Sequence, residues 1–385
     1  MGEMVTFPSN GDSCDGYLAV PESGSGPGVI VVQEWWGLVD HIIDVCDRFA
    51  AEGFTALAPD LYHGKKVPNG EPDDAEAAGA LLARRHAALR RAEPLFDPAY
   101  EDPDVARAEV AAMLADGATG AVAVQDGETT GYLLGRHRDQ PTWGPNLWVE
   151  AAGHAVRDAE TVRDLYAAAA PSWLERGWDA HYALVPAHDA ALVDAWFRLG
   201  FGQSHVHGIR EVPVEPWQPP AHLVVRGPRR EDVRALAELD VALPDHQLLA
   251  PTFAAGEIFT VEEAMAEWAE SFDSDGDDGY HHVVVEHEGR VIGAATACSL
   301  ERSSGHSGLT RPPHTGFLGY ASVLPDARGL GAGRALGEAV LGWVRDEGFT
   351  SAVTDWRATN LLSSRAWPAL GFRPSFYRLH RRIGY

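Results

Sequence analysis

VLPDARGLGAG, residues 323–333, joins an apolar predicted strand at 317–323 to an amphipathic predicted helix at 333–347. Its glycines let the backbone take positive φ angles and approach an anion closely, so that successive N–H groups point at phosphate oxygens. The following helix adds the positive end of its dipole, and Arg328 and Arg334 add charge. An ordinary strand-to-helix turn is the alternative. The placement between strand and helix favours a site for a diphosphate.

The chain divides into three segments and one linker. Residues 1–75 run strand, helix, strand, which predicts a parallel strand pair. Four prolines between 213 and 220 predict a linker at 213–221, because proline removes hydrogen-bond donors and excludes helix. The two remaining segments, 76–212 and 222–385, each contain a hairpin, further strands and helices, and a final Leu-Gly-Phe. One architecture therefore occurs twice.

The bulk composition excludes several classes of partner. A formal charge of -25 disfavours contact with a phosphate backbone, and no apolar stretch is long enough to span a bilayer. The three cysteines are widely spaced, which indicates neither a disulfide framework nor a metal site. The acidic stretch 273–279 lacks the glutamate that a calcium loop needs at its twelfth position, Val284. We expect a cytoplasmic protein without metal, nucleic-acid or membrane partners; the oligomeric state is left open.

A second motif lies beyond the glycine loop. It reads Asn360-x-x-Ser363-x-x-Ala366-Trp367-x-x-Leu370-Gly371-Phe372. Together with Val323-x-Pro325 and Arg328-x-x-Gly331-x-Gly333, this motif resembles the GNAT acetyltransferase superfamily over Leu223 to Ile383. The resemblance implies an α/β fold class with two tandem GNAT folds, each a mixed, mostly antiparallel sheet with helices on both faces.

The same resemblance implies that acetyl-CoA binds where the strand ending at Val323 splays from the strand ending near Asp355. Backbone amides near Ser322, Val323 and Leu324 would hold the pantetheine arm and polarise the thioester carbonyl. Asn360 would hydrogen-bond the cofactor and also cap the following helix. The expected cofactor-binding residues are Ser322, Val323, Leu324, Arg328, Gly329, Leu330, Gly331, Ala332, Gly333, Arg334 and Asn360.

The chemistry implied is attack by a neutral amine on the thioester, which requires a base. Asp355 and His314, near strand ends, are the candidate bases, although either could be a loop cap or a surface residue. Trp367 stands where many family members carry a tyrosine that protonates the leaving thiolate, and an indole N–H cannot act as a general acid. Tyr377 on the last strand is a candidate acid, and Trp367 is interpreted as a packing residue.

The middle segment also resembles a GNAT domain, through residues 195–201 (Ala-Trp-Phe-Arg-Leu-Gly-Phe). Asp189 occupies the position that corresponds to Asn360. Residues 157–162, where the phosphate loop would lie, contain no glycine and two carboxylates, which repel a diphosphate and obstruct close backbone approach. We expect this copy to bind no CoA. A degenerate first copy beside a competent second copy is the arrangement of tandem GNAT proteins.

Residues Gly16 to Lys65 resemble the start of dienelactone hydrolases, in the α/β-hydrolase superfamily. The resemblance depends on the sequences at 31–37, 47–53 and 58–62. It implies a partial β-α-β unit in which Glu34 takes the place of a glutamate that contacts the nucleophile. No Gly-x-Cys-x-Gly elbow with a following Asp and His is present, so this segment is expected to have lost its chemistry.

The sequence therefore predicts an N-acetyltransferase that moves acetyl from acetyl-CoA to a primary amine of a small molecule or peptide. Two alternatives remain open: an acyl-CoA-binding sensor without transferase activity, and a hydrolase of the dienelactone type.

Overall fold

The computed structural model describes residues 2–9, 12–32, 38–61, 72–139, 144–254, 259–273 and 279–384. It divides into two compact units, Met1–Glu71 and Pro72–Tyr385, which are described separately. Glu34, most of the 31–37 motif, the hydrolase-like residues after Leu61 and most of the acidic stretch at 273–279 lie outside the described residues.

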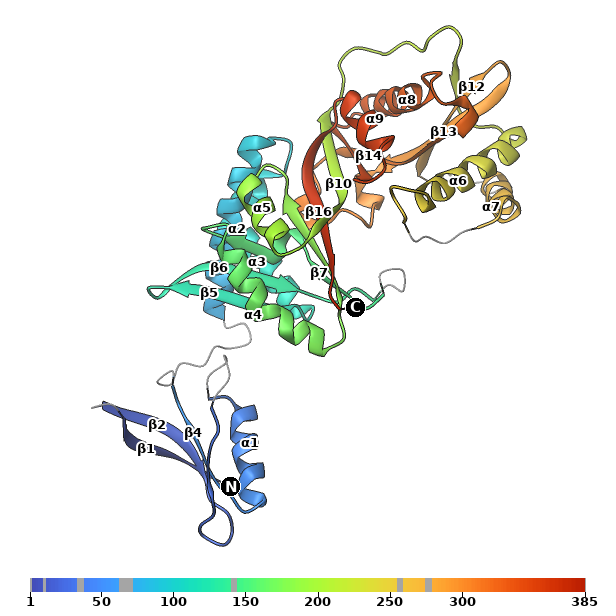
Figure 1. Ribbon diagram of the computed structural model, residues 1–385. Coiled ribbons are helices and arrows are strands. Elements are labelled where there is room, and N and C mark those ends of the chain that lie inside the picture. Colours follow the sequence, from blue (N-terminus) through green and yellow to red (C-terminus); the bar gives the residue numbers. More distant parts are fainter. Residues whose placement is uncertain are drawn as a thin grey trace. The chain divides into compact units, whose positions relative to one another are not determined.

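The first unit is a small sheet covered by one helix (Figure 1). Its elements are β1 Glu3–Ser9, β2 Asp12–Ala19, β3 Gly28–Ile30, α1 Asp40–Ala51 and β4 Thr55–Pro59. The parallel pairing of β3 with β4 confirms the predicted strand-helix-strand unit. The β1–β2 hairpin was not predicted, because β1 is largely exposed and β2 contains Asp, Ser and Gly among its few apolar residues. Cys46 on α1 is buried in the core of this unit.

The second unit begins with the elements of the middle segment. They are α2 Pro72–Ala92, α3 Pro103–Ala115, β5 Thr119–Gln125, β6 Glu128–Gly135, β7 Asn146–Val149, β8 His154–Val156, α4 Thr161–Glu175, β9 Ala180–Pro186, α5 Ala190–Arg198 and β10 Gly202–Glu211. The predicted turn at 125–128 joins β5 to β6, with Asp126 and Gly127 at φ values of 52° and 79°. Both angles are positive, as tight hairpin turns require.

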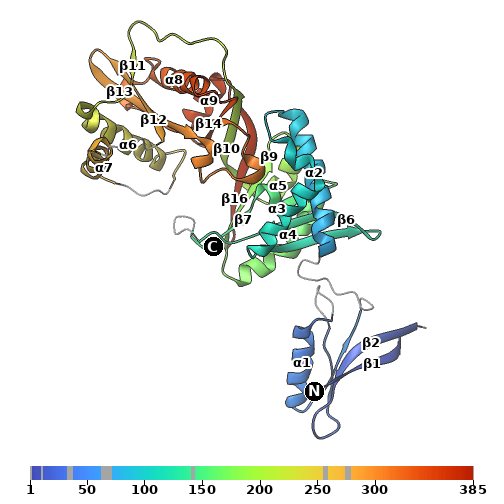
Figure 2. The same ribbon diagram turned by 180° about the vertical axis from the view of Figure 1, so that it is seen from behind.

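The last segment repeats this order. Its elements are β11 Val224–Arg226, α6 Val233–Leu248, α7 Val261–Asp273, β12 Tyr280–His287, β13 Arg290–Ser299, β14 Thr315–Val323, α8 Ala332–Asp346, β15 Ser351–Arg357, α9 Ser363–Ala369 and β16 Arg373–Arg382. The hairpin turn at Glu288-Gly289 is again as predicted, with φ values of 50° and 78°. Helices α6 and α7 lie on one side of the strands β12 to β14 and α8 lies on the other, in both views (Figures 1 and 2). The mixed sheet with helices on both faces confirms the predicted fold class.

The two segments exchange their last strands. Among the described residues, nine strands form one sheet in the order β11-β12-β13-β14-β15-β10-β16-β9-β7. Strand β10, which ends the middle segment, pairs with β15 and with β16 of the last segment. Strand β16 in turn pairs with β9 of the middle segment, so each final strand lies within the other segment's part of the sheet.

A shared core and an ion-pair cluster lie over this exchange. Phe376 on β16 packs edge-on against Phe96, and both belong to a core that also holds Ile209 and Val353. Arg373 bridges Glu93 at 2.6 Å and Glu211 at 2.7 Å, which joins β16, after the linker, to two residues that precede the linker. The boundaries at 212 and 222 remain a prediction, but residues from both sides of the linker build one core.

The strand exchange predicts that residues 222–385 do not fold alone. Without β10, strands β15 and β16 lose the neighbour that lies between them, and the backbone groups on both edges lose their partners. We expect the 222–385 fragment to show no cooperative thermal transition by near-UV circular dichroism, whereas residues 72–385 unfold cooperatively. Co-expression of 72–221 with 222–385 should restore a stable complex. A monomeric 222–385 fragment with a sharp transition would contradict the interpretation.

Candidate functional site

The site begins where two parallel strands separate. Strands β14 and β15 pair only from Thr315 with Ser351 to Leu318 with Thr354, and then diverge. Gly319 is an extra residue in β14: on β13, Ala297 pairs with Leu318 and Thr296 with Tyr320. A β-bulge of this kind bends its strand and increases its twist. The sequence predicted that the strand ending at Val323 separates from the strand ending near Asp355, and the separation begins at this bulge.

Beyond the bulge, the register determines which backbone groups face the split. The Leu324 N–H donates to the Ile292 carbonyl of β13 at 3.0 Å. Because hydrogen-bonding directions alternate along an antiparallel strand, the N–H groups of Val323 and Ala321 point to the opposite side, toward the split. Of Ser322, Val323 and Leu324, whose amides were expected at the site, the register directs only that of Val323 to the split and those of the other two to β13.

The glycine loop forms the N-terminus of α8. Gly329 and Gly331 have φ values of 91° and 87°, which L-residues with a Cβ rarely adopt. Gly331 is the N-cap residue, and no side chain caps the helix. The first bond of the helix runs from the Ala335 N–H to the Gly331 carbonyl at 3.0 Å, so the preceding amides have no acceptor within the helix. A Cβ added to Gly333 would meet its nearest neighbour, Val323 Cγ2, at 3.9 Å, an ordinary van der Waals contact, so this helix start is not crowded.

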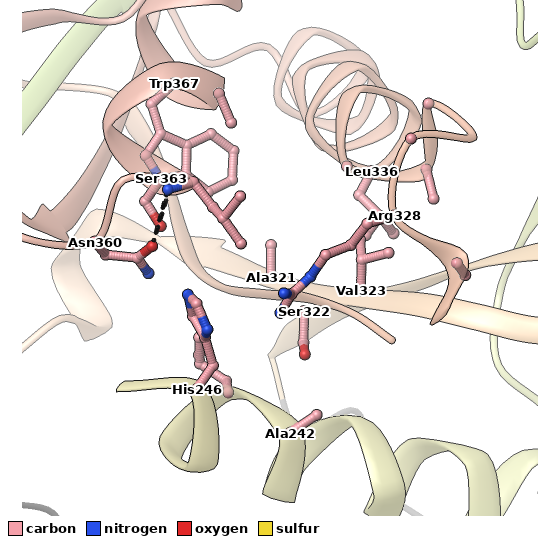
Figure 3. Close-up of a pocket in the computed structure, with 18 residues that line it drawn as sticks. Ala242, His246, Ala321, Ser322, Val323, Arg328, Leu336, Asn360, Ser363 and Trp367 are labelled. Atoms are coloured by element: carbon pink, nitrogen blue, oxygen red, sulfur yellow. Dashed lines mark hydrogen bonds between the residues drawn. The ribbon is translucent and has the colours of Figure 1, made fainter. Parts of the chain in front are cut away.

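A cavity of about 420 Å³ lies between these elements (Figure 3). Eight of the predicted cofactor residues line it: Ser322, Val323, Arg328, Gly329, Gly331, Ala332, Gly333 and Asn360. The other three do not line it. Leu324 is buried in the core, Leu330 packs against the same core, and Arg334 is exposed beside Glu338 at 3.6 Å. No ion pair of Arg328 is found within the described part of the chain.

Asn360 stabilises the turn before α9 and also faces the cavity. Its side-chain oxygen accepts hydrogen bonds from the N–H groups of Leu362 at 3.1 Å and Ser363 at 3.4 Å, and the residue is 3% exposed. These bonds hold the turn that leads into α9, whose N-cap residue is Leu362 and not Asn360 as the sequence suggested. The amide nitrogen lies on the side of the cavity that faces His246 (Figure 3).

Helix α6 supplies a wall of the cavity that the sequence did not reveal. Ala242, Leu243 and His246 lie in its last turns and line the cavity (Figure 3). Their spacing is that of an ordinary amphipathic helix, and no motif marks them. Trp367 lines the cavity from α9, is 8% exposed and contacts Phe372 edge-on. This burial is consistent with the packing role expected for it.

A second cavity, of about 180 Å³, lies beside the first. It shares the lining residues Leu243, Ala321, Ser363 and Trp367 with the larger cavity. Its own lining residues include Asp355, Arg357, Tyr320 and His205. Asp355 is half-buried and pairs with His207 through the backbone, but its carboxylate makes no hydrogen bond or ion pair with any residue that the structure describes. One predicted catalytic residue therefore lies at the split with its carboxylate available.

The other two predicted catalytic residues lie elsewhere. His314 precedes β14 at the end opposite the split, is exposed, and lines a separate cavity of about 380 Å³. Tyr377 on β16 is paired with Val206 and packs between two cores. Neither residue lines the two cavities at the split.

The protonation states of two neighbours limit the candidates for a base. Burial, followed by Arg378 and Arg357, lowers the pKa of His205 to about 2, so this imidazole is neutral near pH 7. Burial and the nearby Asp240 raise the pKa of Tyr320 well above its usual value, so its hydroxyl keeps its proton. Asp240 itself accepts a hydrogen bond from Trp268 Nε1 at 2.6 Å. Asp355 is the carboxylate that lines the cavity.

The matching split in the middle segment is filled by the protein itself. There β7 pairs in parallel with β9, while β8 pairs with β6. Arg85 from α2 is fully buried and donates to the carbonyls of Ala151 and His154 between these strands. His154 Nε2 lies 2.9 Å from the Leu184 carbonyl and bridges β8 to β9. The positions that are open beside β14 are occupied here.

Two absences concern only the described residues. They contain no group of three or more His, Cys, Asp or Glu side chains placed to hold a metal ion. No helix among them is long and apolar enough to cross a membrane.

Comparison with known proteins gives two family matches in different parts of the chain. Residues 246–372 match the model of the acetyltransferase (GNAT) family. This region is what the chain shares with the GNAT family. It contains the glycine loop, the strand split and the Asn360 motif. Residues 14–113 match the model of the dienelactone hydrolase family, a match that runs past the first unit into α2 and α3.

Individual relatives fall into the same two groups. Protein usf of Aquifex pyrophilus is 56% identical over 78 residues, which are 20% of this chain and 32% of that protein. The chain thus spans about a third of the length of the curated relatives it matches. A GCN5-related N-acetyltransferase from Sphaerobacter thermophilus is 19% identical over 82% of this chain and 96% of its own, with a TM-score of 0.48. A tandem GNAT protein from the clavulanic acid biosynthesis pathway is 18% identical over 82% of this chain and 97% of its own, with a TM-score of 0.42.

The buried histidine of the small cavity predicts acid sensitivity. The pKa of His205 is about 2 in the folded chain and near 6.5 when unfolded, so the unfolded chain binds this proton first as the pH falls. The stability present above pH 6.5 is therefore lost on acidification, by about 1.4 kcal/mol per pH unit between pH 6 and 4. We expect His205→Gln to reduce the slope of unfolding free energy against pH by that amount, as measured by urea titration. Parallel pH profiles for the two proteins would contradict the assignment.

Proposed function

We propose that this protein is an acyltransferase that moves acetyl from acetyl-CoA to a primary amine at the split between β14 and β15. The observation that carries the proposal is the uncapped N-terminus of α8, reached through two glycines of positive φ, beside a cavity that opens at the strand split. The GNAT match of residues 246–372 supports it. Acetyl-CoA binding at this site is likewise a proposal.

The residues present fit a diphosphate. The free amides at the start of α8 and the exposed Arg328 would hold its oxygens, because a helix N-terminus and a guanidinium both favour anions. This local positive potential matters in a chain whose formal charge is -25. The N–H of Val323 would hold the pantetheine arm along the free edge of β14, and the Asn360 amide would contact the same arm.

The transfer step needs a polarised carbonyl. The Ala321 N–H lies next to the bulge and faces the split, where it would donate to the thioester oxygen as negative charge develops there. The amine nitrogen bonds to the carbonyl carbon, and the carbon–sulfur bond breaks to release the CoA thiolate. A dedicated acid is not essential, because an ordinary thiol has a pKa of about 8.5 and its thiolate leaves readily near neutral pH. This removes the difficulty posed by Trp367.

Asp355 would accept the proton that the amine loses. Once the nitrogen has bonded to the carbonyl carbon it is far more acidic than a free ammonium, so a carboxylate can take its proton directly or through one water molecule. Asp355 lines the small cavity beside the split, near the charges of Arg357 and Arg378, and its carboxylate has no hydrogen bond or ion pair among the described residues. We propose it as the catalytic base and leave His314 and Tyr377 out of the mechanism, since neither lines the site.

The alternative of a non-catalytic acyl-CoA sensor has one observation in its favour, the buried indole of Trp367 at the position of the family's acid. Acetyl-CoA consumption, followed by thiol release over a panel of amines, separates the two functions. A hydrolase activity of the first unit is not proposed. Its described cysteines are Cys14, hydrogen-bonded to the Asp60 carbonyl at 3.6 Å, and Cys46 in the core.

The glycine loop gives the first functional prediction. Replacing Gly331 with Val strains the backbone at φ 87° and places a side chain over the helix N-terminus, so acetyl-CoA affinity should fall at least ~100-fold by calorimetry. Gly348→Val is the matched control, because Gly348 has φ 78° but lies at the other end of α8. Ala159→Leu, at the filled middle site, should also leave the affinity unchanged. Equal losses in all three variants would argue against the site.

Asp355 gives the second functional prediction. Asp355→Asn keeps the shape of the side chain but cannot accept a proton, so kcat should fall at least ~100-fold while the Kd for acetyl-CoA stays within twofold. Asp346→Asn, an exposed carboxylate on α8, serves as the control. An unchanged kcat in Asp355→Asn, measured by thiol release at saturating amine, would show that another group or solvent accepts the proton.

A further inference from the structure

The small cavity contains a cation that the transfer step does not use. Arg357 follows Asp355 by two positions on β15, and side chains two apart on a strand face the same side. Both residues line this cavity, and their Cα atoms are separated by roughly 6.7 Å at the usual rise per residue. A carboxylate and a guanidinium therefore stand side by side at the place where an acceptor would bind.

Arg357 is half-buried without a carboxylate within ion-pair distance among the described residues. Its Nε donates to the side-chain oxygen of Gln247 at 2.9 Å, a neutral partner from α6. Removing a guanidinium from water costs free energy unless its donors find acceptors, and charged acceptors compensate best. The Gln247 bond fixes the plane of the guanidinium and leaves its two terminal nitrogens as a fork of donors.

Among the described neighbours, Asp355 is the carboxylate whose charge favours this cation, and it lies at the position proposed for the amino group. His205 is neutral, and Arg378 on β16 adds a second positive charge close to Asp355. Asp240, the nearby carboxylate of α6, is held by Trp268. The lining of the cavity thus carries one carboxylate and one guanidinium group, with Arg378 as a further buried cation nearby, in a chain that is strongly acidic elsewhere.

We infer that the acceptor is a small zwitterionic amine, whose amino group lies at Asp355 and whose oxyanion is bound end-on by Arg357. The fork of two N–H donors matches the paired oxygens of a carboxylate, and a phosphate presents the same pair. A cavity of about 180 Å³ suits an acceptor the size of an amino acid. This inference rests on the proposed function, since it specifies the acceptor of the same transfer.

The test compares amines that differ in charge but not in reach. Thiol release from acetyl-CoA is measured for the full chain with 4-aminobutanoate, phosphoethanolamine and butylamine. We expect kcat/KM to be at least ~10-fold higher for an anionic amine than for butylamine, because a hydrogen bond to a charged group is worth about one to two powers of ten. The carboxylate and phosphate arms show which oxyanion is preferred.

Substitutions at Arg357 separate recognition from structure. In Arg357→Gln, KM for the preferred anionic amine should rise ~10- to 100-fold, with kcat and acetyl-CoA affinity within twofold and butylamine kinetics unchanged. Arg357→Lys should recover part of the loss, since a single ammonium retains the charge without the fork. Equal losses for anionic and neutral amines, or a preference for butylamine in the parent protein, would overturn the inference.

A binding measurement keeps the two proposals distinguishable. Calorimetric titration of 4-aminobutanoate and phosphoethanolamine into the CoA-saturated protein does not depend on turnover. Binding that requires Arg357 without thiol release would leave the oxyanion site standing and reject the transferase. Acetyl transfer that does not depend on Arg357 would reject the oxyanion site and leave the transferase proposal standing. If neither binding nor transfer is observed, both proposals are rejected.

Discussion

The site depends on one constraint, the loss of pairing between β14 and β15 after Leu318. While two parallel strands stay paired, each satisfies the other's backbone groups and nothing can enter between them. The bulge at Gly319 bends β14 away while β13 keeps its register on the far side, so the amides of Ala321 and Val323 point into an opening instead of toward a neighbour. The glycine loop, the uncapped helix and the two cavities are all arranged around this opening.

The exchange of final strands determines what lies on the acceptor side of the opening. Strand β10, from the middle segment, takes the place beside β15 and brings His205 against the face that carries Asp355 and Arg357. The middle segment therefore supplies part of the wall of the small cavity although its own split is filled. The buried, neutral His205 reduces the water around Asp355 without adding charge, and a carboxylate interacts more strongly with a nearby cation when less water screens it.

The sequence predicted best the features that leave a local chemical signature. Gly329 and Gly331 had to be glycines because the backbone there has positive φ, and the two hairpin turns follow from the same requirement at Gly127 and Gly289. The β10 and β16 exchange could not be foreseen, because strand pairing is a long-range choice and β10 reads as polar, with His205, His207 and Arg210 along it. His246 and Arg85 belong to no recognisable motif. Their positions, at the cavity and at the filled middle split, follow only from the packing of helices α6 and α2.

Arg85 suggests how the first copy could lose its ligand and remain folded. A cofactor that binds between two diverging strands also stabilises the fold, because it forms hydrogen bonds with backbone groups that would otherwise lack partners. In the first copy the side chain of Arg85, which is part of the chain itself, donates to the carbonyls of Ala151 and His154. Because this group belongs to the chain, its effective concentration does not depend on any ligand in solution, so this half of the molecule would keep one shape whatever the supply of acetyl-CoA.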